Sequence, residues 1–376
     1  MSFTGITPDR FVRKTGKNLS LERILDRAVR EEALSGEEIL FLLGLSRGDE
    51  IGKLFRIARE LRERYFGNRV FLYGFLYFST WCRNHCNFCY YRSTNRACNR
   101  YRKTDAEIYE ASLRLAQSGV HLLDFTMGED PFYYGETDGF PALLDLTKRI
   151  KNDTGLSIMA SWGVVPPAVL RRLRQAGVDW FACYQETHSR ELFQTLRPNQ
   201  DYDRRMQLKF DAWRLGLLIE EGVLSGVGES PLDIAHSLEF MRSLQFHQVR
   251  VMNFVPQEGT PMSPFPHPHP TRELIITAVL RLLLPHRLIP ASLDVYGVDG
   301  LPGKLEAGAN VVTSLIPPEA KLNGVAQSTL DISEGHRTVK GITPILHESG
   351  LQTAGREDYL SWMREARMQS RIGIES

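Results

Sequence analysis

Short apolar segments alternate with amphipathic segments from residue 70 to residue 318. Eight of them are rich in β-branched and aromatic residues, and each predicts a buried strand: 70–80, 121–128, 156–161, 179–186, 222–229, 248–256, 288–297 and 308–314. Most are separated by segments with apolar residues at helical spacing: 104–119, 139–152, 166–177, part of 203–221, 230–244 and 271–285. This alternation predicts an α/β fold with a parallel sheet, and eight units predict closure into a (β/α)8 TIM-like barrel. An open, doubly wound sheet is the alternative.

The chain divides into three predicted parts. Residues 1–69 form an N-terminal helical segment, residues 70–318 the barrel, and residues 319–376 a C-terminal extension. In a barrel of this type the reactive side chains lie at the C-terminal ends of the strands. Helices from either terminal segment are candidates to cover that mouth, although neither segment carries a readable motif.

Composition and charge narrow the class of protein. The chain has 46 basic and 45 acidic residues and a formal net charge of +1, which favours neither nucleic acid nor a membrane surface as partner. The longest apolar runs, 70–78 and 274–284, are shorter than the roughly 20 residues of a membrane helix. The first residues lack the apolar core of a signal peptide, so we expect a cytoplasmic protein. Nucleic-acid binding rests only on the arginine-rich loop 92–103, which is more typical of a solvated face.

Three cysteines follow the first predicted strand directly. Cys82, Cys86 and Cys89 are separated by three and then two residues, and Tyr90 comes next. Three thiolates bind three irons of a [4Fe–4S] cluster and leave the fourth iron open to an outside molecule. A structural zinc site needs a closed tetrahedral set, for which His85 is the only nearby candidate, and it remains an alternative. The spacing therefore favours a cluster that acts on a bound molecule.

This spacing, at the end of the first barrel strand, resembles the radical S-adenosylmethionine enzymes. In that family the amino and carboxylate groups of S-adenosyl-L-methionine chelate the open iron, and one electron releases a 5′-deoxyadenosyl radical. The resemblance implies a [4Fe–4S] cluster held by Cys82, Cys86 and Cys89, with S-adenosyl-L-methionine as cofactor. It also implies an electron donor protein such as flavodoxin or ferredoxin.

Four further residues and Tyr90 are implied to bind the cofactor. Gly128 and Glu129, in the sequence MGED, resemble the Gly-Gly-Glu segment that holds the amino group of S-adenosylmethionine. Glu186 and Arg205 are nineteen residues apart and resemble the cofactor-binding pair of the biotin synthase and hydrogenase maturase branch. An ordinary surface ion pair between Glu186 and Arg205 is the alternative.

The remaining cysteines argue against biotin synthase itself. That enzyme holds a second cluster with further cysteines, whose positions fall near Thr126, Met159 and Leu224, and none of these binds iron. Cys183 lies in an apolar strand and is expected in the core, whereas Cys98 in the arginine-rich loop is expected to be incidental.

Charged residues in the predicted strands indicate the substrate. Asp124 lies in the second strand, Arg250 in the sixth, and Ser292 and Asp294 in the seventh. A charge inside a barrel needs a partner. Two carboxylates and a guanidinium complement two ammonium groups and a carboxylate, which is a diamino acid such as lysine or ornithine. A structural network of Arg250 with Asp124 or Asp294 is the alternative.

Longer segments resemble the methylornithine synthase family, notably 73–92, 125–134, 249–262 and 305–318. The resemblance implies isomerisation of L-lysine to 3-methylornithine, the first step of pyrrolysine biosynthesis, by radical fragmentation and recombination. It places Asp124, Arg250, Ser292 and Asp294 on the substrate. Two other functions remain open: a radical enzyme of the same branch acting on another small amino-acid-like molecule, and a zinc-stabilised binding module without catalysis.

Overall fold

The computed structural model describes residues 19–135, 139–317 and 336–375. Parallel strands pair in the order β6-β5-β4-β3-β2-β1-β8-β7, and a single bridge between Gln248 and Leu288 joins the two ends. The strands are β1 (Arg69–Ser79), β2 (Leu122–Met127), β3 (Ser157–Ser161), β4 (Trp180–Ala182), β5 (Leu218–Ser225), β6 (Gln248–Asn253), β7 (Pro290–Ser292) and β8 (Val311–Leu315). The sequential order confirms the TIM-like barrel, and the doubly wound alternative is wrong.

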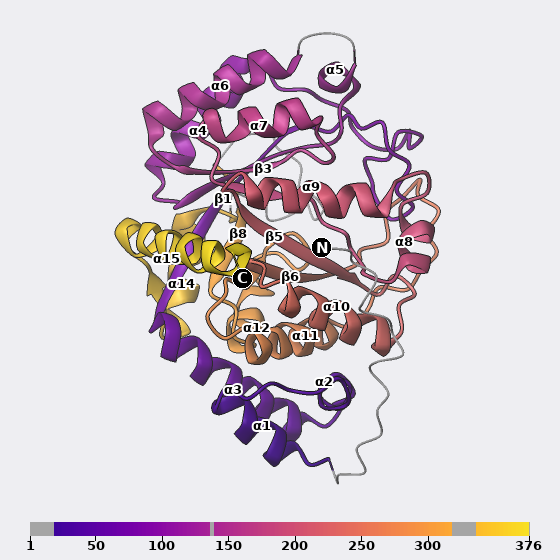
Figure 1. Cartoon of the computed structure of the whole chain (residues 1–376), viewed down its shortest axis with the longest axis vertical. Helices are drawn as coiled ribbons and strands as arrows, with labels where there is room; N and C mark the ends of the chain where they lie inside the picture. Colours follow the sequence, from indigo (N-terminus) through magenta and orange to yellow (C-terminus); the bar gives the residue numbers. More distant parts are fainter. Residues whose placement is uncertain (1–18, 136–138, 318–335, 376) are drawn as a thin grey trace.

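Helices surround this barrel (Figure 1). They are α4 (Asp105–Gln117), α5 (Pro131–Tyr134), α6 (Gly139–Thr154), α7 (Pro167–Gln175), α8 (Arg190–Leu196), α9 (Tyr202–Arg214), α10 (Pro231–Ser243), α11 (Pro270–Leu283) and α12 (Leu301–Glu306). Reciprocal capping boxes, Thr104 with Glu107 and Ser230 with Asp233, begin α4 and α10. The side chain of each cap accepts from a backbone amide that has no partner inside the helix.

One strand begins earlier than the sequence pattern predicts. The pattern assigned 203–221 to a segment containing a helix, but α9 ends at Arg214 and β5 already begins at Leu218. Two consecutive glutamates, Glu220 and Glu221, are typical of an exposed helix and yet are buried here. This correction matters because Glu220 proves to be part of the candidate site.

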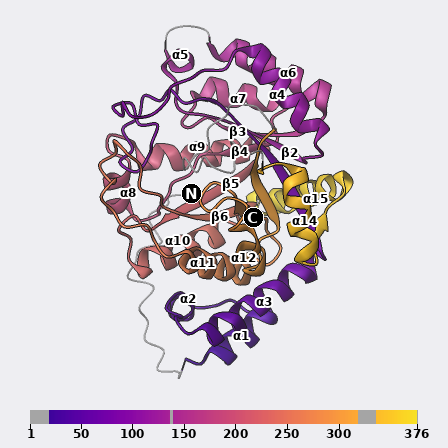
Figure 2. The ribbon, with the colours of Figure 1, turned by 180° about the vertical axis from the view of Figure 1, so that it is seen from behind.

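Among the described residues, the N-terminal helices lie away from the barrel mouth (Figure 1), whereas Arg337 of the C-terminal extension reaches it. Helices α1 (Leu21–Val29), α2 (Gly36–Leu43) and α3 (Gly48–Phe66) form a lobe at one end of the molecule, packed against α10, α11 and α12 (Figures 1 and 2). The extension contains α14 (Val339–Glu348), β9 (Gln352–Thr353) and α15 (Arg356–Glu375). The boundaries proposed at residues 69 and 318 stay predictions.

Helix α15 closes the N-terminal end of the barrel, opposite the mouth. β9 pairs with the first residues of β1, which brings α15 beneath the strands. The Tyr359 and Tyr73 hydroxyls lie 2.9 Å apart, and Trp362 stacks on Trp180 with ring centroids 5.9 Å apart. This helix therefore does not cover the barrel mouth. In the described ranges, no helix is long and apolar enough to cross a membrane.

Candidate active site

The three cysteines lie in the loop that leaves β1 at the C-terminal end of the barrel. All are free thiols, and Cys86 is buried. Burial, and then the neighbouring thiol of Cys86, raises the pKa of Cys82 to about 11. Burial also raises the pKa of Cys89, with added contributions from Cys86 and Cys82. These two thiols therefore lie close enough to the neighbouring cysteines for each charge to affect the others.

This loop suits a cluster better than a single metal ion. Across 19–135, 139–317 and 336–375, no group of three or more His, Cys, Asp or Glu side chains is arranged to hold a metal ion. His85, the proposed fourth zinc ligand, instead lies 2.9 Å from the Ser93 hydroxyl. A four-iron cluster takes its thiolates on separate irons, so its ligands do not converge on one point. The donor set therefore fits the [4Fe–4S] group.

Gly128 allows the second strand to approach the cysteine loop. A Cβ atom there would lie 2.3 Å from the Trp81 carbonyl oxygen and 2.9 Å from Cys82 Cβ. The next residue, Glu129, is buried; its Oε2 accepts from Arg83 Nε at 2.9 Å and its Oε1 from the Val164 amide at 2.9 Å. The MGED segment thus packs directly on the cysteine loop, and its expected role in binding the cofactor stays a prediction.

Arg205 is buried and Glu186 is partly buried, and the two do not pair with each other. Glu186 has a φ of 69°, a strained value for this residue type, and its Oε1 accepts from Arg197 Nη2 at 2.7 Å. Burial raises the pKa of Glu186, and the charges of Arg197 and Arg205 oppose that rise. Arg205 donates to the Tyr184 carbonyl at 2.8 Å and to Gln200 Oε1 at 3.2 Å. The surface ion pair considered above is wrong.

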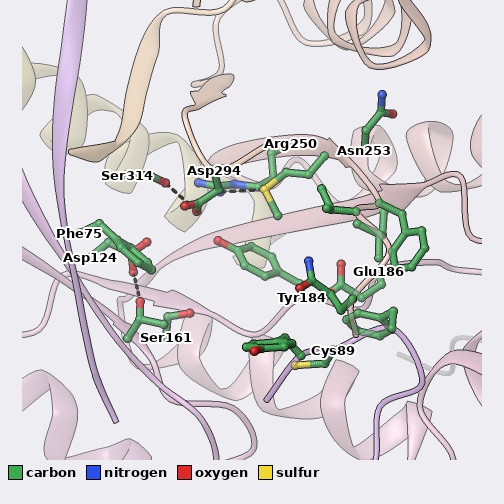
Figure 3. Close-up of a pocket in the computed structure, with 18 residues that line it drawn as sticks. Phe75, Cys89, Asp124, Ser161, Tyr184, Glu186, Arg250, Asn253, Asp294 and Ser314 are labelled. Carbon is green, nitrogen blue, oxygen red and sulfur yellow. Dashed lines mark hydrogen bonds between the residues drawn. The ribbon is translucent and has the colours of Figure 1, made fainter. Parts of the chain in front are cut away.

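A cavity of about 100 Å³ extends from the cysteine loop into the barrel. Figure 3 shows Cys89 at one end, Arg250 and Asp294 at the other, and the Tyr184 ring between them. The lining residues are Phe75, Phe88, Cys89, Tyr90, Asp124, Thr126, Ser161, Tyr184, Glu186, Leu224, Arg250, Met252, Asn253, Phe254, Val255, Gln257, Asp294 and Ser314. Three of the four substrate residues suggested by the sequence therefore meet in one cavity beside three residues of the cysteine loop.

Arg250 is held by a glutamate that the sequence reasoning missed. Its Nε donates to Glu220 Oε1 at 2.5 Å, and Glu220 also accepts from the Tyr184 hydroxyl at 2.9 Å. Burial opposes the charge, but Glu220 raises the pKa of Arg250 overall. The alternative, in which Arg250 pairs with Asp124 or Asp294, is wrong. Within the described residues, the buried Nη2 of Arg250 has no hydrogen-bond partner.

Asp124 is the cavity carboxylate without an ion pair among the described residues. The Thr126 hydroxyl donates to its Oδ1 at 2.8 Å. Burial, and then the charge of Glu220, raises the pKa of Asp124 to about 7, and Arg250 limits that rise. A buried carboxyl in this environment gains from an arriving cation.

Asp294 has partners on both oxygens. The Ser314 hydroxyl donates to Oδ2 and Arg337 Nη1 to Oδ1, each at 2.8 Å. Ser292 lies behind the cavity wall, where its hydroxyl is 3.3 Å from that of Ser314. Ser292 is thus one hydrogen bond removed from the cavity that Asp294 lines.

The arginine-rich loop is folded against the cysteine loop. Arg100 donates to the carbonyl oxygens of Thr80, Tyr91, Arg92 and Asn95. The expectation of a solvated face is therefore wrong for Arg100. Cys98 is buried, 3.5 Å from the Asn95 carbonyl oxygen, and Cys183 lies in the core as expected.

The residues that sequence reasoning missed are Tyr184, Arg197, Gln200, Glu220 and Arg337. Charged Glu220 was hidden by a pattern typical of a helix. Arg197 and Gln200 lie between two helices, outside any motif, and Arg337 lies in an extension without a readable pattern. One signal was available for two of them. Tyr184 follows β4 and Glu220 lies in β5, so alternation along these strands points to the barrel interior once β5 is assigned correctly.

Comparisons with known proteins identify the family of this chain. Residues 76–209 match the model of the Radical SAM superfamily. The chain is 43% identical to 3-methylornithine synthase of Methanosarcina acetivorans, over 92% of this chain and 97% of that protein. It is 30% identical to the [FeFe] hydrogenase maturase subunit HydE of Thermotoga maritima, over 69% of this chain and 74% of that one. A crystal structure of methylornithine synthase superposes with a TM-score of 0.86 at 41% identity, covering 90% of this chain and 99% of that one.

Proposed function

Because this chain belongs to the 3-methylornithine synthase family of radical S-adenosylmethionine enzymes, we propose that it isomerises L-lysine to 3-methylornithine. This reaction is the first step of pyrrolysine biosynthesis. One observation carries the proposal for the site: Arg250, whose buried Nη2 has no hydrogen-bond partner among the described residues, and Asp124, which has no ion pair among them, line the same cavity as Cys89. They complement the carboxylate and an ammonium of an amino acid.

Each end of lysine has a proposed partner. Arg250 Nη2 receives the substrate carboxylate, while Glu220 fixes the guanidinium through Nε. Asp124 receives one ammonium group, and Asp294 the other. Ser292 supports Asp294, because its hydroxyl accepts from the Asp294 backbone amide at 3.3 Å. Burial makes each of these ionic contacts stronger than it would be in water.

The cysteine end of the cavity holds the cofactors in this proposal. Cys82, Cys86 and Cys89 bind the [4Fe–4S] cluster, and together with S-adenosyl-L-methionine this group supplies the 5′-deoxyadenosyl radical that abstracts hydrogen from lysine. Glu129, Glu186, Arg205, Tyr90 and Gly128 hold the S-adenosylmethionine. Apolar residues such as Phe75, Phe88 and Leu224 line the cavity and keep water from the substrate fragments.

An electron donor is the remaining partner. The proposed cluster needs one electron for each cleavage, and a flavodoxin or ferredoxin is the kind of protein that supplies it. We propose that the reaction takes place in the cytoplasm, since thiols that bind a cluster persist in a reducing compartment.

The test is an anaerobic assay of reconstituted enzyme with reductant, S-adenosylmethionine and L-lysine. We expect mass spectrometry and chromatography to reveal a new amino acid of the same mass as lysine. L-Ornithine, one methylene shorter, is the matched control and should not be converted. Formation of 5′-deoxyadenosine with lysine unchanged would contradict the substrate while retaining the radical chemistry.

A further inference from the structure

Two side-chain donors from outside the cysteine loop converge on the sulfur of Cys86. Arg197 Nη1 lies 3.3 Å from Sγ, and Gln200 Nε2 lies 3.0 Å from it. Both donors come from the segment between α8 and α9. The sulfurs of Cys82 and Cys89, by contrast, face backbone amides, those of Asn84 and Tyr91 among them. Cys86 is therefore distinguished by a charged donor.

The same two side chains also form hydrogen bonds with two of the proposed cofactor-binding residues. Arg197 also donates from Nη2 to Glu186 Oε1 at 2.7 Å, and Gln200 Oε1 accepts from Arg205 Nη1 at 3.2 Å. Glu186 is therefore connected to the Cys86 sulfur through Arg197, and Arg205 is connected to it through Gln200. Glu186 and Arg205 do not contact each other.

The surroundings hold this arrangement in place. The Asn87 amide donates to the Leu196 carbonyl oxygen at 2.9 Å, and its side chain donates to the Thr195 carbonyl oxygen at 2.7 Å. These bonds join the cysteine loop to the end of α8. The Arg197 side chain is 10% exposed, so its charge is weakly screened by solvent.

We infer that Arg197 and Gln200 are positioning residues that raise the reduction potential of the cluster proposed above. Reduction adds negative charge to the cluster and its thiolates, and donors to the sulfurs stabilise that added charge. A cation does so more strongly than an amide. Arg197 thus favours electron uptake by the cluster while it also orients Glu186 toward the cofactor.

The experiment is a redox titration of the reconstituted enzyme without lysine, followed by electron paramagnetic resonance. Arg197→Met should lower the equilibrium constant for reduction of the cluster at least tenfold. For a one-electron couple this is a fall of 59 mV or more in the reduction potential. Gln200→Leu should lower it less, and Arg197→Lys should retain part of the wild-type value. Arg190→Met is the matched control: Arg190 lies on α8 in an exposed pair with Asp203, and its loss should leave the potential unchanged.

Iron and sulfide analysis precedes each titration. If Arg197→Met holds a cluster with the wild-type potential, the inference is wrong. If that variant loses its cluster, Gln200→Leu decides the matter, and a wild-type potential there also overturns the inference. Loss of the cluster in both variants would assign these residues to cluster assembly and equally overturn it. Because no lysine is present, a wrong substrate assignment does not affect the result.

Discussion

Arg337 enters the barrel mouth from the C-terminal extension and donates to Asp294 across 2.8 Å. The two side chains are 1% and 3% exposed and lie 43 residues apart in the sequence. Asp294, which the sequence suggested as a substrate-binding residue, therefore already pairs with a side chain of this protein. The extension contributes to both ends of the barrel, with α15 at the base and Arg337 at the mouth.

Replacing Arg337 should weaken lysine binding. In Arg337→Met, Asp294 loses the cation that holds its carboxylate in position for an ammonium group of the substrate. The loss of one charged hydrogen bond corresponds to about 1.5–3 kcal/mol, or roughly a tenfold or larger rise in the KM for lysine. Steady-state kinetics check this, with Arg337→Lys expected to fall between the two. An unchanged KM would show that Asp294 does not need this partner.

Replacing any cysteine of the loop should remove the cluster. In Cys82→Ala, Cys86→Ala or Cys89→Ala one iron loses its thiolate, so we expect loss of the brown colour and of S-adenosylmethionine cleavage. Iron and sulfide analysis measure the first, and 5′-deoxyadenosine formation the second. Cys98→Ala is the matched control and should keep both. Cleavage that persists in a loop variant would rule out the cluster assignment.

Replacing Arg250 should abolish lysine turnover and leave the cluster intact. Truncating one partner of a buried ion pair costs about 2–5 kcal/mol, here through loss of the substrate carboxylate and an unpaired Glu220. Arg250→Ala is the test variant, with cluster absorbance as the check on folding. Glu220→Gln keeps the guanidinium and should chiefly raise KM. Turnover of lysine at the wild-type rate in Arg250→Ala would contradict the diamino-acid site.

Lysine affinity should depend on pH through Asp124. Its pKa is raised to about 7, so below that pH the lysine-free enzyme holds a proton there that an arriving ammonium must displace. Affinity should rise up to about tenfold per pH unit toward pH 7 and then level off. The same raised pKa makes this carboxyl less favourable to folding as pH increases from 3.8 to about 7.

Calorimetric titration with lysine measures both the affinity and the proton released. In Asp124→Asn the side chain does not titrate, so the pH dependence between 5 and roughly 7 should flatten while affinity falls. A wild-type slope that survives in Asp124→Asn would assign the dependence to another group.

Much of this protein follows from local patterns in the chain. The period of the apolar residues is local, as is the spacing of Cys82, Cys86 and Cys89. These features were enough to predict the barrel, the cluster loop at its mouth, and the strands that carry Asp124 and Arg250. These patterns were sufficient because each depends only on residues within one or two neighbouring secondary-structure elements.

Ion pairing was decided only by tertiary structure. Arg250 pairs with Glu220 from the neighbouring strand, Glu186 with Arg197, and Asp294 with Arg337. Each pair joins residues 11 to 43 positions apart, and several charges of each sign were available to every partner. Local sequence fixes which charges lie inside the barrel, but strand register and packing fix which of them meet, because a buried charge is stabilised only by the partner that geometry brings within reach.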